Sequence, residues 1–405
     1  EDGRSFELAC SYVVAADGAG SRLRAALGIA MEGPEALQHY IMIHFEADLR
    51  ELTAARPGVL YFVLDPGTSG VLIAYDRAET WVLMHPYDPA IHAQETFDEA
   101  RCRSLVEAAI GAPLRLTIRN ISPWTMSAQI AARYRAGRVF LVGDAAHRFP
   151  PTGGLGMNTG VVDAQNLAWK LAAVLKGQAG DALLDSYEAE RRPVAVVNAE
   201  QSLLNASRIF ELFAAVFGPD PARQTDHYRA LAADPAASAE LRAAIEAQRP
   251  HFDSLNLQLG YRYHPGARAD GSMPPAGADV DISNYQPSWE VGAHLPHLWV
   301  SRDGERVSLL SLRDPAGFTL LAGPAAGIWS SAADAIGMHR VVADRDFSAS
   351  RDWSSLTGLP DSGALLVRPD GHIAQRFSGS NDAAADLSLA LSTLLAAPAA
   401  ASTMR

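Results

Sequence analysis

Residues 137–170 constrain the fold of this chain more than any other segment, and they read GRVFLVGDAAHRFPPTGGLGMNTGVVDAQNLAWK. The apolar run 138–142 predicts a buried strand, and the glycines and prolines after it predict an irregular loop. A helix is expected to begin near Met157 and Asn158 and to be amphipathic over 161–176. This order predicts an α/β unit that binds a ligand at the carboxyl end of its strand.

The residue types in this segment suit a flat, partly anionic ligand. Gly143 lets the chain turn after the strand, and the Asp144 carboxylate is suited to binding a ribose hydroxyl. Gly153, Gly154 and Gly156 leave the backbone open to close approach, and the helix N-terminus favours negative charge. A Gly-Asp pair or a glycine-rich loop alone is usually only a turn, so the interpretation rests on the whole ordered set.

The segment resembles the second FAD signature of the flavin-dependent aromatic hydroxylases, the single-component monooxygenases similar to para-hydroxybenzoate hydroxylase. The positions that match are Gly143, Asp144, Ala145, Ala146, His147, Pro150, Pro151, Gly154, Gly156, Asn158, Asp163 and Ala164. Another motif of that family, Asp-Gly-x-x-Ser-x-x-Arg after a strand, matches at Asp17, Gly18, Ser21 and Arg24. Alone, such an Asp-Gly turn is mostly structural, but together with the first match it supports the same family.

The resemblance implies a cofactor-binding role for most of these residues. Asp144 would bind the ribitol or phosphate side of FAD, while residues 154–158, including Met157, would contact the isoalloxazine ring. Asp17 and Arg24 would serve the pyrophosphate and nicotinamide-coenzyme side. His147 belongs to the expected cofactor site, although a hydrogen-bonding role within the loop is the alternative.

The resemblance also implies a reaction, the hydroxylation of a phenolic or polycyclic aromatic substrate with O2 and NADPH or NADH through a flavin C4a-hydroperoxide. Pro150 and Pro151 would form the catalytic wall beside the flavin. Tyr61, Trp124 and Met126 are candidates for the substrate pocket, although aromatic residues in strands more often belong to the core. No catalytic base is identified.

The remaining pattern predicts a mixed α/β and α+β chain. Strands are expected at 5–16, 40–47, 59–64, 71–75, 80–84, 115–121, 307–312, 318–322, 340–343 and 364–368. Helices are expected at 22–27 (closed by Gly28), 97–110, 182–217 and 383–395, with Pro193 kinking or breaking the third. The short strands joined by turns imply an antiparallel sheet.

These elements predict a para-hydroxybenzoate hydroxylase-like FAD domain in two pieces, 1–30 and 131–217. An antiparallel-sheet substrate domain at 31–130 would separate them. A connecting region at 218–293, a thioredoxin-like domain at 294–395 and a flexible tail at 396–405 would follow. The last domain lacks C-x-x-C, so its role would be structural or oligomeric, which leaves a homodimer open.

Composition excludes several other classes. The 405 residues carry 34 Lys and Arg against 46 Asp and Glu, a net charge of −12 without a basic run, which disfavours nucleic-acid binding. No apolar run is long enough for a membrane span, and Cys10 and Cys102 alone fit a reducing cytoplasm. Asp144 and His147 have no third ligand at a recognisable spacing, so no metal site is expected.

The start of the chain qualifies this interpretation. The family's first signature, G-x-G-x-x-G, does not occur, and a buried strand begins within ten residues of Glu1. We therefore expect missing upstream sequence and an incomplete FAD site. The alternative hypothesis is a non-catalytic remnant or a half-enzyme that needs a separate N-terminal fragment to bind FAD. A flavin-dependent oxidoreductase that does not hydroxylate is a third, weaker hypothesis.

Overall fold

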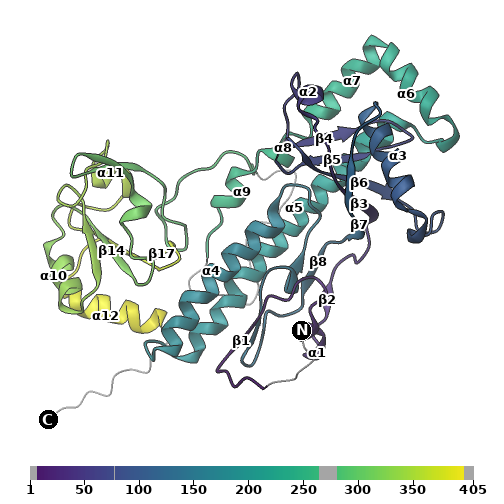
Figure 1. Ribbon diagram of the computed structural model, residues 1–405. Coiled ribbons are helices and arrows are strands. Elements are labelled where there is room, and N and C mark those ends of the chain that lie inside the picture. The colour runs from purple at the N-terminus through teal and green to yellow at the C-terminus, as the bar shows by residue number, and fades with distance from the viewer. Residues whose placement is uncertain (1–6, 77, 264–280, 396–405) are drawn as a thin grey trace.

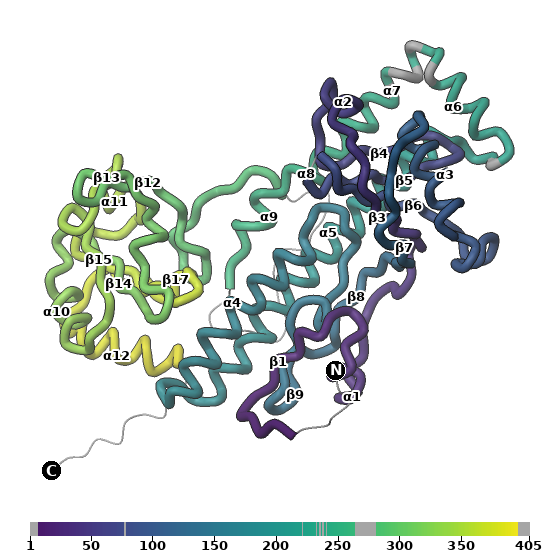
Figure 2. Tube along the Cα trace, viewed as in Figure 1, coloured from purple at the N-terminus to yellow at the C-terminus, as the bar shows by residue number. Residues whose placement is uncertain are grey.

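The computed structural model describes residues 7–76, 78–263 and 281–395. Two long helices, α4 (Leu155–Leu175) and α5 (Asp185–Phe217), form the middle of the molecule. An antiparallel sheet lies at one end of α5, and a C-terminal domain lies to the other side of the helix pair (Figures 1 and 2). The long helices thus connect two separately folded regions.

The two motif regions come together in a small sheet beside α4 and α5. Strand β1 (Val13–Ala15) pairs in parallel with β10 (Val139–Leu141), although more than a hundred residues separate them. The neighbouring elements are α1 (Arg22–Ala26), β2 (Met31–Glu32), β8 (Gln129–Ala131), β9 (Arg135–Ala136) and β11 (His147–Arg148). The predicted strand 5–16 is thus limited to Val13–Ala15 among the described residues, because only this part has a pairing partner. Gly28 closes α1 as expected, with a φ of 62°.

Residues 31–130, the predicted substrate domain, contain a five-stranded antiparallel sheet. Its order is β4 (Leu60–Val63), β5 (Gly70–Ala74), β6 (Thr80–Tyr87), β3 (Gln38–Glu46) and β7 (Thr117–Met126). One face packs on helix α3 (Glu99–Ile110), where Trp81, Phe45 and Val106 belong to one apolar core. The short helices α2 (Arg50–Thr53) and η1 (Gln94–Thr96) lie in the connections. Because side chains alternate along a strand, the opposite face of this sheet presents a second set of residues.

Helix α5 is continuous through Pro193, so the predicted break does not occur. Proline removes one backbone hydrogen bond, but Val194, Ala195 and Val197 are buried immediately after it, and this packing keeps the helix intact. The predicted start of this helix at 182 was also wrong, since residues Asp181–Leu184 form the 3₁₀ helix η3 and α5 begins at Asp185.

The connecting region 218–293 is more regular than predicted. It contains η4 (Pro221–Arg223), α6 (Gln224–Ala233), α7 (Pro235–Glu246), α8 (Arg249–Phe252) and α9 (Leu255–Leu259). Figure 1 shows α6 and α7 extending beyond the antiparallel sheet. Residues 264–280 of the link from α9 to the C-terminal domain, and the predicted tail 396–405, lie outside the described residues.

The C-terminal domain has a four-stranded sheet in the order β15 (His339–Val342), β14 (Thr319–Ala322), β16 (Ala364–Val367), β17 (Ile373–Phe377). Its other elements are β12 (Trp299–Arg302), β13 (Glu305–Ser308), η5 (Leu309–Leu312), α10 (Gly327–Ala335), α11 (Trp353–Thr357) and α12 (Ala383–Leu394). A parallel β14–α10–β15 unit followed by β16–β17–α12 is compatible with the predicted thioredoxin-like fold. The predicted strand 307–312 ends at Ser308, where a 3₁₀ turn buries Leu309 and Leu312.

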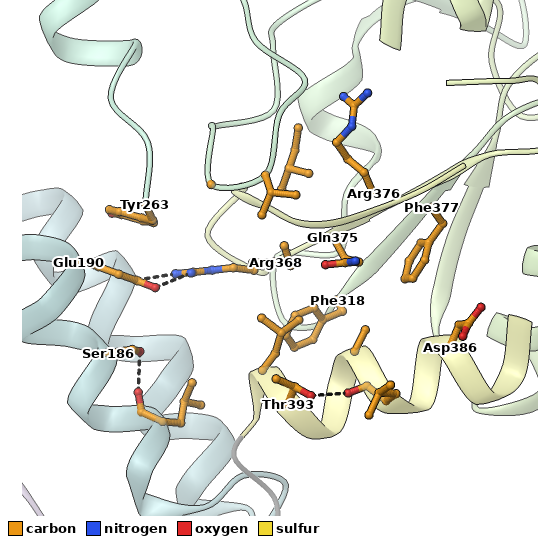
Figure 3. A pocket seen from close by; sticks show the side chains of 18 of the residues that line it. Ser186, Glu190, Tyr263, Phe318, Arg368, Gln375, Arg376, Phe377, Asp386 and Thr393 are labelled. Carbon is orange, nitrogen blue, oxygen red and sulfur yellow. Dashed lines mark hydrogen bonds and ion pairs between the residues drawn. The ribbon is translucent and has the colours of Figure 1, made fainter. Parts of the chain in front are cut away.

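A buried charge cluster joins this domain to α4 and α5. Arg368 donates to the Glu190 carboxylate at 2.6 and 2.8 Å, and Lys170 donates to it at 2.7 Å. Figure 3 shows Glu190 and Arg368 pointing toward one another, in direct contact, at the wall of a cavity of about 680 Å³ between the two regions. Trp169 of α4 also donates to Asp370, at 3.0 Å. Because each buried charge has a partner, the cluster fixes the domain without leaving an isolated ion.

Candidate active site

The segment 143–154 forms a tight loop on the N-terminal part of α4. Gly143 has a φ of 60°, and a Cβ on Gly160 of α4 would lie 3.0 Å from its Cα. The loop and the helix therefore touch backbone to backbone, which only glycine at these positions allows. Asp144 follows within a 3₁₀ turn, Gly143–Ala145, and its side chain is exposed. The predicted carboxylate is thus available to a ligand.

The Asp17 motif closes onto the same loop. Ser21 accepts the Arg24 backbone N–H at 3.0 Å and begins α1, while Asp17 accepts the N–H of Leu23 at 3.2 Å. A hydrogen bond from Ser21 lowers the pKa of the Asp17 carboxyl. The Arg24 guanidinium donates to the carbonyl oxygens of Ala145 at 2.8 Å and Ala19 at 3.0 Å. The structure thus brings the two sequence motifs together.

The N-terminus of α4 fits the group that the motif predicts. Gly154 precedes the helix in the left-handed region, with a φ of 65°, and no side chain caps the first turn. Met157 is 78% exposed, and the Asn158 amide donates back to the Gly154 carbonyl at 2.9 Å. Uncapped N–H groups with the positive end of a 21-residue helix attract an electron-rich ring edge. Gly154, Gly156, Met157 and Asn158 therefore lie where the predicted flavin ring could bind.

His147 lies behind the loop in a buried hydrogen-bond network. Its Nε2 is 2.7 Å from Oδ2 of Asp163, both side chains are fully buried, and its ring stacks on Phe149. Arg191 donates to Asp163 at 2.8 Å and to the Tyr263 hydroxyl at 3.0 Å. Burial alone would raise the pKa of Asp163, but the hydrogen bond from His147 and the charge of Arg191 hold it below its ordinary value. Protein surrounds His147, which supports the loop-positioning alternative.

A separate apolar cavity of about 290 Å³ lies between the sheet and the C-terminal half of α5. Residues on the face of the sheet turned away from α3 form one wall, and α5 forms the other with Ala206, Ile209, Phe210, Phe213 and Phe217. Pro151 and Thr152 of the glycine-rich loop and His251 of α8 complete it. This size and lining suit an aromatic ring.

The structure separates the three predicted substrate residues. Met126 lines the cavity. Trp124 is not part of the cavity wall, but it pairs across the strands with Tyr40, a wall residue, and their ring centroids lie 5.7 Å apart with the planes tilted by 39°. Tyr61 does not line the cavity: its ring packs toward Trp81 on the opposite face, and its hydroxyl donates to the Arg56 carbonyl at 3.0 Å. Of the two predicted catalytic prolines, Pro151 lines the cavity and Pro150 is buried beside it.

Two family models match the chain, an FAD binding domain over residues 1–202 and an aromatic-ring hydroxylase C-terminal domain over residues 288–398. The tetracenomycin A2 monooxygenase-dioxygenase of Streptomyces glaucescens is 36% identical over 97% of this chain and 67% of its own length. The chain belongs to the FAD-dependent aromatic hydroxylases. Another relative in this family, the 2,4-dichlorophenol 6-monooxygenase of Cupriavidus pinatubonensis, is 35% identical over 97% of the chain and 70% of its own length.

Solved structures of hydroxylases in this family share the fold. The flavin-dependent monooxygenase PieE, in complex with FAD and substrate, is 34% identical with a TM-score of 0.81 and covers 96% of this chain and 70% of its own. Aklavinone-11 hydroxylase in complex with FAD and aklavinone is 33% identical with a TM-score of 0.73. The match covers 95% of this chain and 68% of that one. The chain spans between 64% and 70% of the length of the most similar curated relatives.

Some features of the site were missed in the sequence analysis. Gly160, Arg191 and Tyr263 had no assigned role, yet they position the loop and its buried network. The signal for Gly160 was a glycine within an otherwise regular helix, which indicates close backbone approach. Within the described ranges, none of the helices combines the length and the hydropathy that crossing a bilayer requires.

Proposed function

We propose that this chain carries the flavin and substrate sites of a monooxygenase that hydroxylates a phenolic or polycyclic aromatic ring with NADPH or NADH and O2. One observation carries the proposal. The glycine-rich loop that leads into the uncapped α4 N-terminus also supplies Pro151 and Thr152 to the apolar cavity. A flavin held by the loop and a ring held in the cavity would therefore meet at these residues.

The chain's own residues would bind and orient both partners. When bound, FAD supplies the oxygen activation that no amino-acid side chain provides. Asp144 would accept hydrogen bonds from cofactor hydroxyls, and the first turn of α4 would stabilise negative charge on the ring edge. Arg24 holds the loop through Ala145 rather than facing a ligand with all of its donors.

The cavity would position the substrate and exclude water. Its walls are mainly apolar, and two of its polar side chains are already bonded elsewhere: Gln38 donates to the carbonyls of His39 and Tyr87, and Thr152 donates to Ser202. Burial raises the pKa of Tyr40 to about 12, so its hydroxyl stays protonated at neutral pH. A dry cavity limits unproductive reaction with water.

The test is a titration of the purified chain with FAD, followed by NADPH and NADH oxidation with and without 2,4-dichlorophenol. Because the sequence has no G-x-G-x-x-G, we expect weak FAD binding by the chain alone and tighter binding once an N-terminal segment that carries this signature is added. With FAD bound, we expect substrate-stimulated coenzyme oxidation that yields a hydroxylated ring, detected by mass spectrometry. Coenzyme oxidation that yields only hydrogen peroxide would favour an oxidoreductase that does not hydroxylate. A chain that binds the phenol but never FAD, even with that N-terminal segment supplied, would contradict the proposed flavin site.

A further inference from the structure

His251 is an unusual member of the cavity wall because neither ring nitrogen of its side chain has a hydrogen-bond partner among the described residues. The residue comes from the short helix α8, is 7% exposed, and lines the cavity opposite the sheet. Nδ1 is fully covered and has no hydrogen-bond partner among the described residues. Leaving such a group unpaired costs about 1–3 kcal/mol, so most buried polar atoms in folded proteins are paired.

The other ring nitrogen of His251, Nε2, lies on the accessible edge of the imidazole. No hydrogen bond of Nε2 occurs within the described part of the chain, and Nε2 is not among the atoms that are both covered and unpaired. The ring is held in place by stacking on Phe252, with centroids 4.4 Å apart and planes 5° from parallel. A fixed ring with one accessible nitrogen is pre-organised to bind a polar group of a ligand.

The imidazole is also in the state that suits a neutral partner. Burial lowers the pKa of His251 to about 4, so the ring is uncharged at neutral pH. A neutral imidazole has one donor and one acceptor nitrogen, and a phenolic hydroxyl can bond with either. The neighbouring wall residues Phe213, Ile209 and Met84 offer only apolar contact.

We infer that His251 recognises an oxygen substituent of the aromatic substrate through its accessible ring nitrogen, and so selects hydroxylated rings over plain hydrocarbons. This inference rests on the proposed function, because it takes the cavity to be the substrate site. His251 is a specificity-determining residue that touches the substrate, and it has no part in holding the flavin.

The test compares two ligands that differ by one hydroxyl, 2,4-dichlorophenol and 1,3-dichlorobenzene. Their dissociation constants are measured by calorimetry on the full chain, without coenzyme and with FAD added. In H251F we expect the preference for the phenol to fall about tenfold, the value of one hydrogen bond, while the affinity for dichlorobenzene stays within about twofold. H251Q, which keeps a donor and an acceptor, is expected to retain more of the preference than H251F.

A control variant separates hydrogen bonding from loss of wall area. Phe213→Leu trims the apolar wall and should weaken both ligands by the same factor, leaving their ratio unchanged. Circular dichroism and the Tm of each variant show that it is folded. An unchanged preference in H251F, or equal losses in H251F and H251Q, would overturn the inference while the cavity remained an aromatic site. If neither ligand bound the unaltered chain, the proposed substrate site itself would fail, and the inference with it.

Discussion

The Arg24 guanidinium donates a 2.8 Å hydrogen bond to the backbone carbonyl of Ala145, across 121 residues of sequence. This contact joins the Asp17 motif to the Asp144 loop, and a second bond to Ala19 holds the guanidinium in place. Arg24 is 9% exposed, and burial lowers its pKa, but an arginine stays charged at any ordinary pH. The two motifs therefore form one structural unit.

Arg24→Met should separate the motifs and weaken FAD binding. The change removes both guanidinium hydrogen bonds and leaves the Ala145 carbonyl without its donor, a loss of about 1–3 kcal/mol in unfolding free energy. The FAD dissociation constant, measured by flavin fluorescence, should rise at least about tenfold. Arg22→Met is the matched control, since Arg22 is exposed on the same helix. Equal behaviour of the two variants would show that the contact is unimportant for the cofactor.

Gly156→Ala should separate stability from cofactor binding. A Cβ there would meet only Phe149 Cδ2 at 4.0 Å, and alanine favours a helix by up to about 1 kcal/mol over glycine. We expect an unchanged or higher Tm but weaker FAD binding, because the methyl group would occupy the space for the ring. In Gly160→Ala the new Cβ would lie 3.0 Å from Gly143 Cα, so this change should lower both the Tm and the affinity for FAD. Undiminished FAD affinity in Gly156→Ala would place the ring elsewhere.

Asp163→Asn should destabilise the fold by about 3–5 kcal/mol at pH 7, because it leaves the Arg191 charge buried without its counterion. The folded-state pKa of Asp163 lies below the unfolded value of about 3.9, so its stabilisation is present above that pH and is lost as the pH falls. Urea unfolding between pH 7 and pH 3 should therefore show a shallower acid dependence in the variant. Asp185→Asn, which alters an exposed pair with Arg135, should cost less than about 1 kcal/mol.

Lys170→Met should change how stability depends on alkaline pH. Burial lowers the pKa of Lys170 to about 8 in the folded protein, whereas in the unfolded chain it is about 10.4. Between these values the unfolded state binds more protons, so the lysine makes stability rise with pH, by about 3 kcal/mol in total. Denaturant unfolding at pH 7.5 and pH 10 should show this rise in the unaltered chain and not in the variant. Gln375→Ala, an exposed change in the same interdomain cavity, serves as the control.

Val71→Phe should block the apolar cavity, since Val71 lines it and a larger ring would occupy its volume. The affinity for 2,4-dichlorophenol should fall at least about tenfold while FAD binding is retained. Tyr61→Phe, on the opposite face of the same sheet, should leave ligand affinity unchanged and cost about 1 kcal/mol of stability through its lost hydroxyl bond. A loss of ligand binding in Tyr61→Phe would contradict the assigned faces.

The local chemistry of the site could be predicted because it depends on residues close together in the chain. The Ser21 cap, the Gly28 terminus of α1 and the glycines before α4 each act within one turn of backbone. The predicted strand 5–16 was too long, because pairing with β10 decides which residues form the strand. The break that was one of the two outcomes predicted at Pro193 does not occur for a similar reason, since the packing around α5 outweighs one lost hydrogen bond.

The sequence by itself determined the family and the composition of the flavin loop, because those depend on an ordered run of residue types. Only the tertiary structure decided that Met126 faces the cavity while Tyr61 faces α3. Alternation along a strand assigns side chains to two faces, but the packing of α5 against one of them determines which face becomes the pocket. His251 belongs to the same cavity because folding brings α8 to its edge, and no local pattern around that residue indicates this.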